Sequence, residues 1–125
     1  MALKLFLGLI MASLFQGVPK AQLPCQASII FQQPEAGQLS VQAQCQNNTA
    51  AEFRIRYDMV QEKQGPSGST SNRQSGWATV GAGQRKILSS IRLSMQPADA
   101  YSVQLRIFDQ QGQLVAQDSL VRPAR

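Results

Sequence analysis

Residues 100–109, AYSVQLRIFD, carry the clearest structural signal in this sequence. Every second side chain is apolar, a period of two that is typical of a β-strand with one buried face. The apolar positions are Tyr101, Val103, Leu105 and Ile107, and the residues between them are polar. The pattern predicts a strand at 101–109 that covers one side of a hydrophobic core.

Six further segments on either side of this strand alternate in a similar way between turn signals. They span residues 27–33, 38–45, 51–61, 75–80, 85–95 and 114–121. The 85–95 segment changes its alternation at Ile87-Leu88, which predicts a bulge or a change of sheet near Ser89-Ser90. Seven segments of this kind, with no convincing helix, predict an all-β fold: an antiparallel immunoglobulin-like β-sandwich of about seven strands.

Three local features of this second half of the chain lead to more specific expectations. The connection KQGPSGSTSNRQ, residues 63–74, is rich in Gly, Pro, Ser and Asn, which predicts a flexible loop. Trp77 is the single tryptophan, and we expect it in the core; exposure at a binding surface is the alternative. Tyr101 follows a predicted turn at 97–100, so it is either a tyrosine corner, whose hydroxyl bonds nearby backbone, or a core aromatic whose hydroxyl reaches water.

Three motifs between Ser67 and Leu120 resemble, in their order and spacing, the CsgH family of curli assembly inhibitors. They are SGSTSNRQSG, LSSIRLSM and DAYSVQLRIFDQQGQLVAQDSL. Residues 22–62 match that family only in their strand pattern. The resemblance implies an immunoglobulin-like sandwich in the periplasm of a curli-producing bacterium. It also implies transient contact with the curli amyloid subunit, which the protein keeps from polymerising before export.

The first residues, MALKLFLGLIMASLFQGVPKAQ, have the layout of a secretory signal peptide, with Lys4 before an apolar run and small residues after it. We expect cleavage after Ala21, with Gly17 as the alternative, so that residues 1–21 are the signal peptide and residues 22–125 form a single domain. The run is too short for a permanent membrane anchor. Leu23-Pro24 is also a poor approach to a lipidated cysteine. These features predict a periplasmic protein.

The only two cysteines, Cys25 and Cys45, both follow the predicted cleavage site. An exported protein meets an oxidising compartment, in which disulfides persist. Reflection of the two flanking segments about the turn at 34–37 places Cys25 opposite Cys45 after a one-residue slip or a bulge. We therefore predict a structural disulfide, which would stabilise the fold by roughly 3 kcal/mol. A redox pair is the alternative, but the spacing differs from Cys-x-x-Cys.

Composition argues for a binding protein. The chain has no histidine, which removes the usual general base and the commonest metal ligand. No calcium-loop pattern is present among its acidic residues. We expect no enzyme activity, no cofactor and no metal site. After the signal peptide, ten basic and seven acidic residues leave a net charge of +3, which favours acidic partners but falls short of a nucleic-acid-binding patch.

Four basic residues are the candidates for a partner-binding surface, chosen from charge and strand position: Arg54, Arg56, Lys63 and Arg73. The default interpretation is a solvated sheet face with weak ion pairs. The many glutamines either help an edge strand pair with an aggregating segment or form an uncharged polar coat. A structural or adhesive module of a surface fibre or secretion apparatus is the alternative function. In either role we expect a monomer.

Overall fold

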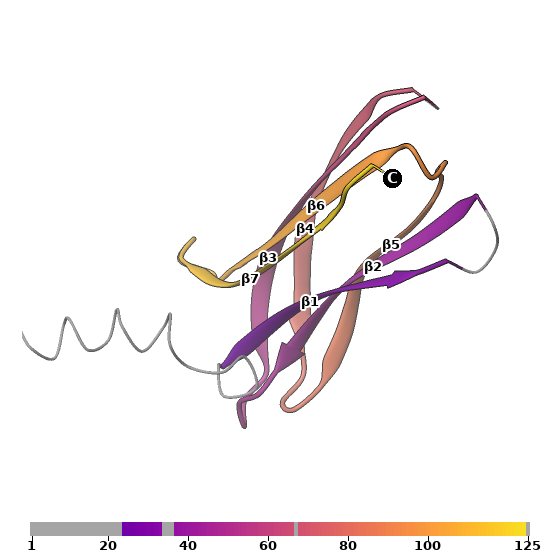
Figure 1. Ribbon diagram of the computed structural model, residues 1–125. Helices are drawn as coiled ribbons and strands as arrows, with labels where there is room; N and C mark the ends of the chain where they lie inside the picture. Colours follow the sequence, from indigo (N-terminus) through magenta and orange to yellow (C-terminus); the bar gives the residue numbers. More distant parts are fainter. Residues whose placement is uncertain (1–23, 34–36, 67, 125) are drawn as a thin grey trace, which may run out of the picture.

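The computed structural model describes residues 24–33, 37–66 and 68–124, which form two antiparallel sheets stacked on each other (Figure 1). One sheet has the strand order β1-β2-β5 and the other the order β4-β3-β6-β7. The strands are β1 (Cys25–Gln32), β2 (Gln38–Asn47), β3 (Phe53–Gln64), β4 (Thr70–Val80), β5 (Arg85–Ser94), β6 (Ala100–Phe108) and β7 (Leu114–Arg122). The predicted all-β sandwich of seven strands is confirmed. The predicted signal peptide lies outside the described residues.

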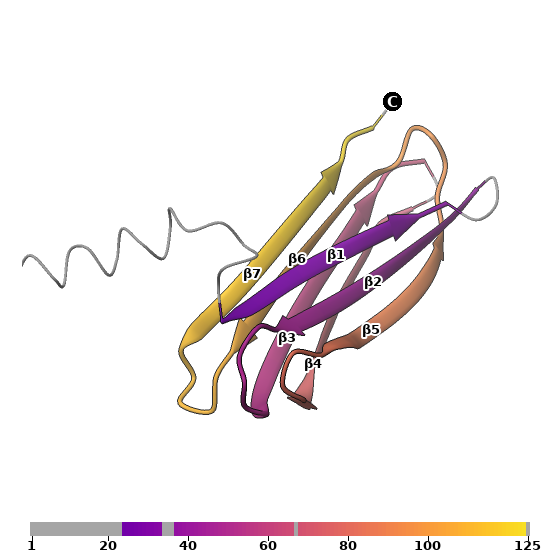
Figure 2. The same ribbon diagram turned by 90° about the horizontal axis from the view of Figure 1, so that it is seen from below.

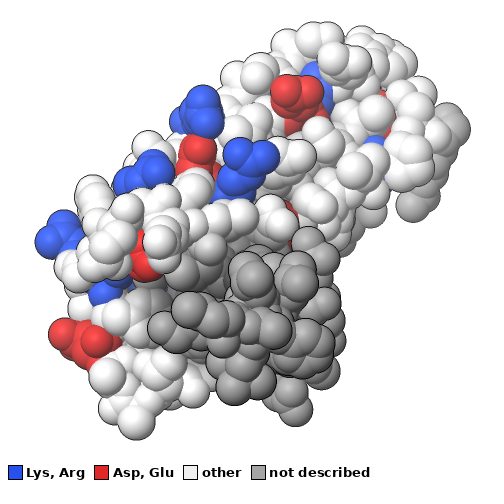
Figure 3. All heavy atoms as spheres, turned by 90° about the vertical axis from the view of Figure 1, so that its left-hand side faces the viewer, with Lys and Arg blue, Asp and Glu red and all other residues white. Residues whose placement is uncertain are grey.

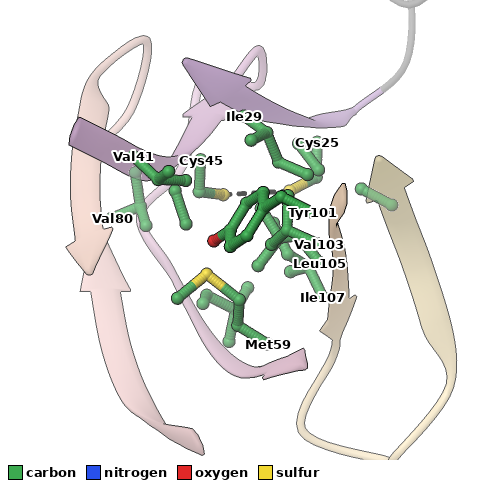
Figure 4. Close-up of a cluster of buried hydrophobic side chains, with 14 of the residues drawn as sticks. Cys25, Ile29, Val41, Cys45, Met59, Val80, Tyr101, Val103, Leu105 and Ile107 are labelled. Atoms are coloured by element: carbon green, nitrogen blue, oxygen red, sulfur yellow. Dashed lines mark hydrogen bonds between the residues drawn. The ribbon is translucent and has the colours of Figure 1, made fainter. Parts of the chain in front are cut away.

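The core lies between the sheets and is built by the alternation of each strand. In the view of Figure 2, β1, β2 and β5 lie in front of the other sheet. Their inward side chains meet those of β3 and β6, and the largest fully buried ones include Val41, Ile55, Met59, Leu105 and Ile107 (Figure 4). Over the part of the chain that the structure describes, no helix is long and apolar enough to span a bilayer.

The predicted flexible loop at 63–74 is largely strand. β3 continues to Gln64 and β4 begins at Thr70, with Lys63 paired to Thr70 across the hairpin. The remaining turn is short, and the Gly68 amide donates to the Gly65 carbonyl over 2.9 Å. The composition of this segment suits a loop, but pairing with β3 satisfies its backbone, and such context overrides weak strand propensity.

The predicted irregularity in the 85–95 segment is confirmed as a β-bulge. Ala43 pairs with Ser89, whereas the next residue of β2, Gln44, pairs with Ile87. Leu88 is therefore the extra residue. The bulge lies one position before the predicted Ser89-Ser90 site.

Tyr101 is a core aromatic, as one of the two interpretations held, but its hydroxyl bonds a side chain and not nearby backbone. The side chain is buried, and its hydroxyl donates to Oε1 of Gln61 over 3.0 Å. Tyr101 pairs with Lys63 on β3, so Gln61 is its diagonal neighbour on the inner face. Burial raises the pKa of Tyr101 to about 12.

Candidate functional site

The outer surface of the four-stranded sheet carries a row of aromatic and arginine side chains. Arg56 on β3 pairs with Trp77 on β4 and with Phe108 on β6, and directly paired residues share one sheet face. The guanidinium carbon of Arg56 lies 4.5 Å from the Phe108 ring centroid, and that of Arg54 lies 4.9 Å from the Trp77 ring centroid. Both distances are in the range of cation–π contacts, which hold the guanidinium groups against the sheet.

The carboxylate of Asp58 lies among the arginines of this face. Asp58 accepts two hydrogen bonds from the Arg73 guanidinium, over 3.0 Å from Nε and 2.8 Å from Nη2. Asp58 also pairs with Arg106 on β6. The bonds from Arg73 lower the pKa of Asp58, helped by the charges of Arg73, Arg56 and Arg106. We call Arg54, Arg56, Arg73, Arg106, Trp77 and Phe108 the arginine face.

Three of the four predicted contact residues lie together on the arginine face: Arg54, Arg56 and Arg73. Lys63 does not join them. Its position in the alternation of β3 turns it inward, where it is only 8% exposed and its Nζ donates to the Ser94 carbonyl over 3.0 Å. Sequence reasoning missed Arg106, although its place between Leu105 and Ile107 already gave its outward direction.

Trp77 also belongs to the arginine face, so the predicted core position was wrong. The side chain is 51% exposed. The inner positions of β4 are taken instead by the small residues Gly76 and Ala78 and by Val80. A Cβ at Gly76 would lie 3.3 Å from the Tyr57 ring, so this ring fills the space in front of β4. Trp77 is left to the outer surface, as the alternative interpretation held.

Cys25 and Cys45 meet in the core, but no disulfide is formed between them in the structure. Both are buried free thiols whose Sγ atoms lie 3.1 Å apart (Figure 4). The prediction that the two cysteines lie directly opposite each other was wrong: Cys25 pairs with Asn47, and Cys45 pairs with Ala27. The observed pairing of β1 with β2 is shifted by one residue from the pairing that symmetry about the turn at 34–37 predicts. The shift makes the two cysteines diagonal neighbours. The hydrogen bond with Cys45, and next burial, raise the pKa of the Cys25 thiol.

The outer surface of the three-stranded sheet differs in character from the arginine face. Gln26 pairs with Gln46, and Ser28 pairs with Gln44. Nε2 of Gln44 donates to Oε1 of Gln42 over 3.2 Å. Over β1 and β2 this surface therefore presents uncharged amides. Figure 3 shows another view of the molecule, in which basic and acidic side chains are interspersed and form no patch of a single sign.

Two curli proteins share the architecture described above. The E. coli curli protein CsgC aligns over 76% of this chain and 96% of its own, with a TM-score of 0.64 and 16% identity. R. palustris CsgH aligns over 77% of this chain and 90% of its own, with a TM-score of 0.60 and 20% identity. The chain has the fold of CsgC and CsgH. The resemblance to the CsgH family is thus confirmed at the level of the fold.

Several other structural matches cover only a small part of a much longer protein. A Bacteroides uniformis beta-glucuronidase aligns over 81% of this chain but only 14% of its own, with a TM-score of 0.58 and 12% identity. No protein-family model and no curated protein sequence matches the chain. Among the described residues, no group of three or more His, Cys, Asp or Glu side chains is placed to hold a metal ion.

Proposed function

We propose that this protein is a periplasmic inhibitor of curli subunit polymerisation. The observation that carries the proposal is the fold match that spans nearly all of CsgC and CsgH, whereas the matched glucuronidase shares only a small part of its length. The CsgH-like motifs at 67–120 support the same function. The predicted signal peptide supports the periplasmic location.

We propose the arginine face as the surface that contacts the amyloid subunit. Guanidinium groups attract acidic side chains over a distance and can bond them bidentately. Trp77 adds an exposed aromatic ring of the kind enriched at the centres of protein interfaces. A bound subunit would then meet a charged surface, and charges on a strand discourage the addition of further strands.

We also propose that the protein acts by binding and not by catalysis. Its two cysteines are buried in the core and hydrogen-bond each other, so neither thiol is exposed to a substrate. The Asp58 carboxylate, which lies among the arginines of this face, is engaged by Arg73. A binding role requires only the exposed side chains of the face.

The test is polymerisation of the curli major subunit from the same organism, followed by thioflavin T fluorescence. The protein, purified after expression of the full-length chain, is added far below stoichiometry. We expect a longer lag phase. An unchanged lag with folded protein would contradict the proposal and favour a structural module, which should instead copurify with fibres in fixed proportion.

A further inference from the structure

The two long sides of the sandwich are closed differently. On one side the Ile29 amide of β1 donates to the Asp118 carboxylate of β7 over 3.0 Å. On the other side, Lys86 of β5 donates to the Thr79 carbonyl over 3.1 Å, and Ser89 of β5 bonds the side chain of Gln74. These contacts cover only the Gln74–Thr79 half of β4. Among the described strands, the Thr70–Arg73 half pairs with β3 alone.

A pocket of about 180 Å³ lies beside this uncovered half of β4. Thr70 and Asn72 line it from β4, and Ile91 and Leu93 line it from β5. Its floor is polar and comes from the inner positions of β3 and β6. The residues that form this floor are Gln61, Lys63 and Tyr101.

The floor holds more hydrogen-bond donors than the described residues satisfy. Gln61 is 5% exposed, and its Nε2 has no hydrogen-bond partner within the described part of the chain. Lys63 is 8% exposed, and the Ser94 carbonyl uses one of the three N–H donors of its ammonium group. Buried donors without partners are costly, so both groups favour a further hydrogen-bond acceptor, and the positive charge of the Lys63 ammonium group favours an anionic one.

The spacing of these two groups suits a carboxylate. Gln61 and Lys63 are two residues apart on one face of β3, which places their Cα atoms about 7 Å apart. A carboxylate has two oxygens that could accept from Nε2 and Nζ together. Glu62 and Arg92 also border the pocket. Glu62 is exposed and alternates to the outer face with Arg56 and Asp58, so its carboxylate is directed away from the inner-face donors of Gln61 and Lys63.

We propose that this pocket binds the carboxylate of an aspartate or glutamate side chain, presented by an extended polypeptide that pairs with the Thr70–Arg73 edge of β4. The uncovered edge supplies backbone groups for such pairing, as in β-strand addition. Lys63 and Gln61 then select the acidic side chain. The pocket opens on the inner side of the sheet and the arginine face on its outer side, although the edge ends at Arg73, which belongs to that face. The inference does not depend on the curli function proposed above.

The experiment is a titration of the isotope-labelled protein, followed by NMR of the Gln61 side-chain amide and the β4 backbone amides. The ligands are a short acidic β-strand peptide, the same peptide with glutamine in place of glutamate, and sodium acetate. We expect the acidic peptide to shift both sets of signals and to bind about tenfold or more tightly than the glutamine peptide. Equal binding of the two peptides, or no shift of the Gln61 amide, would overturn the proposal. Saturation by acetate at the same concentration as the peptide would overturn the role of β4.

Variants separate the pocket from general charge attraction. Lys63→Met removes the ammonium group, and Gln61→Glu supplies an internal carboxylate beside Lys63. Each should weaken the acidic peptide about tenfold or more. Lys86→Met is the matched control on β5 and should change affinity less than twofold. An equal loss in Lys63→Met and Lys86→Met would show attraction by net charge alone and would overturn the site. Because Gln61→Glu keeps a polar side chain of the same size, it tests the pocket even if Lys63→Met fails to fold.

Discussion

The two cysteines allow a prediction at the scale of single residues. Their Sγ atoms lie 3.1 Å apart in the core, whereas the sulfur atoms of a disulfide are about 2.05 Å apart. Oxidation therefore requires the two sulfur atoms to move only slightly closer together. We expect the protein purified from the periplasm to contain no free thiols and to lose roughly 3 kcal/mol of unfolding free energy on reduction. Thiol titration in denaturant and urea unfolding with and without reductant measure these two quantities.

A double variant gives the control for this prediction. The unfolding midpoint of Cys25→Ala with Cys45→Ala should not respond to reductant. Two titratable thiols in the oxidised preparation, together with an unchanged midpoint on reduction, would contradict the predicted disulfide. The buried thiols would then serve only as small apolar core residues.

Asp58 makes stability depend on pH in a defined direction. Arg73 lowers the pKa of Asp58 in the folded state, so folding favours the ionised carboxylate. This contribution is present above the unfolded-state pKa, about 3.9, and is lost as the pH falls through the lower folded-state value. At pH 7 Asp58→Asn should be less stable than the wild type by about 0.2 to 1 kcal/mol, because the Arg73 side of the pair is largely exposed and solvent screens the interaction.

The measurement is urea unfolding of wild type and Asp58→Asn between pH 2 and pH 7. The difference between the two should shrink below pH 4. Glu52→Gln, which changes an exposed acid just before β3, is the control and should follow the wild type. A constant difference between wild type and Asp58→Asn at every pH would rule out the ionised pair as its cause.

At the scale of elements, the Asn47 side chain connects the end of β2 to the segment before β3 and to the end of β4 through hydrogen bonds. Its fully buried side chain donates from Nδ2 to the carbonyls of Ala51, Val80 and Gly81, over 2.8, 3.0 and 3.1 Å. Asn47→Asp would place carboxylate oxygens against these carbonyls. We expect it to cost roughly 3 to 5 kcal/mol, as for other uncompensated buried charges.

Chemical denaturation of Asn47→Asp and of Gln104→Glu tests this role. Gln104 is an exposed residue of β6, so the same change from amide to carboxylate there should alter stability by less than about 0.5 kcal/mol. Similar losses in the two variants would mean that added negative charge is the cause, and not the carbonyl cluster. Asn47→Ala should lie between the two, since it removes the donors without adding a charge.

Some features of the strands could be predicted from the sequence, and others could not. Alternation is a local property, so it predicted seven strands and the outward direction of the arginines. The structure of β4 depends on contacts with other strands, which the local sequence does not reveal. Its loop-like sequence forms a strand because it pairs with β3. Trp77 lies on the outer surface because the Tyr57 ring fills the inner space beside Gly76. The inward direction of Lys63 was also implicit in the alternation of β3. Choosing it by charge alone overlooked that direction.

At the scale of the whole molecule, the two outer surfaces allow the two interpretations of the glutamines to be compared. The surface over β1 and β2 carries glutamines and serines, while the arginine face carries the charge and the exposed tryptophan. We predict that the glutamines form a polar coat. Replacement of Gln26, Gln42 and Gln46 by serine should leave the lag phase of curli subunit polymerisation unchanged. A shorter lag with intact folding would instead support direct pairing of these amides with the amyloid subunit.

Charge reversal on the arginine face should have the opposite result. Arg54→Glu with Arg106→Glu removes one cation–π contact and two positive charges, and adds two negative ones. If this face steers the subunit, about tenfold more protein should be needed for the same lag, and wild-type inhibition should weaken as salt screens the attraction. Arg85→Glu with Lys86→Glu makes the same change in net charge on β5 of the other sheet and should have a much smaller effect. Circular dichroism confirms that each variant is folded. Equal losses in the two double variants would show that net charge, and not the arginine face, determines inhibition.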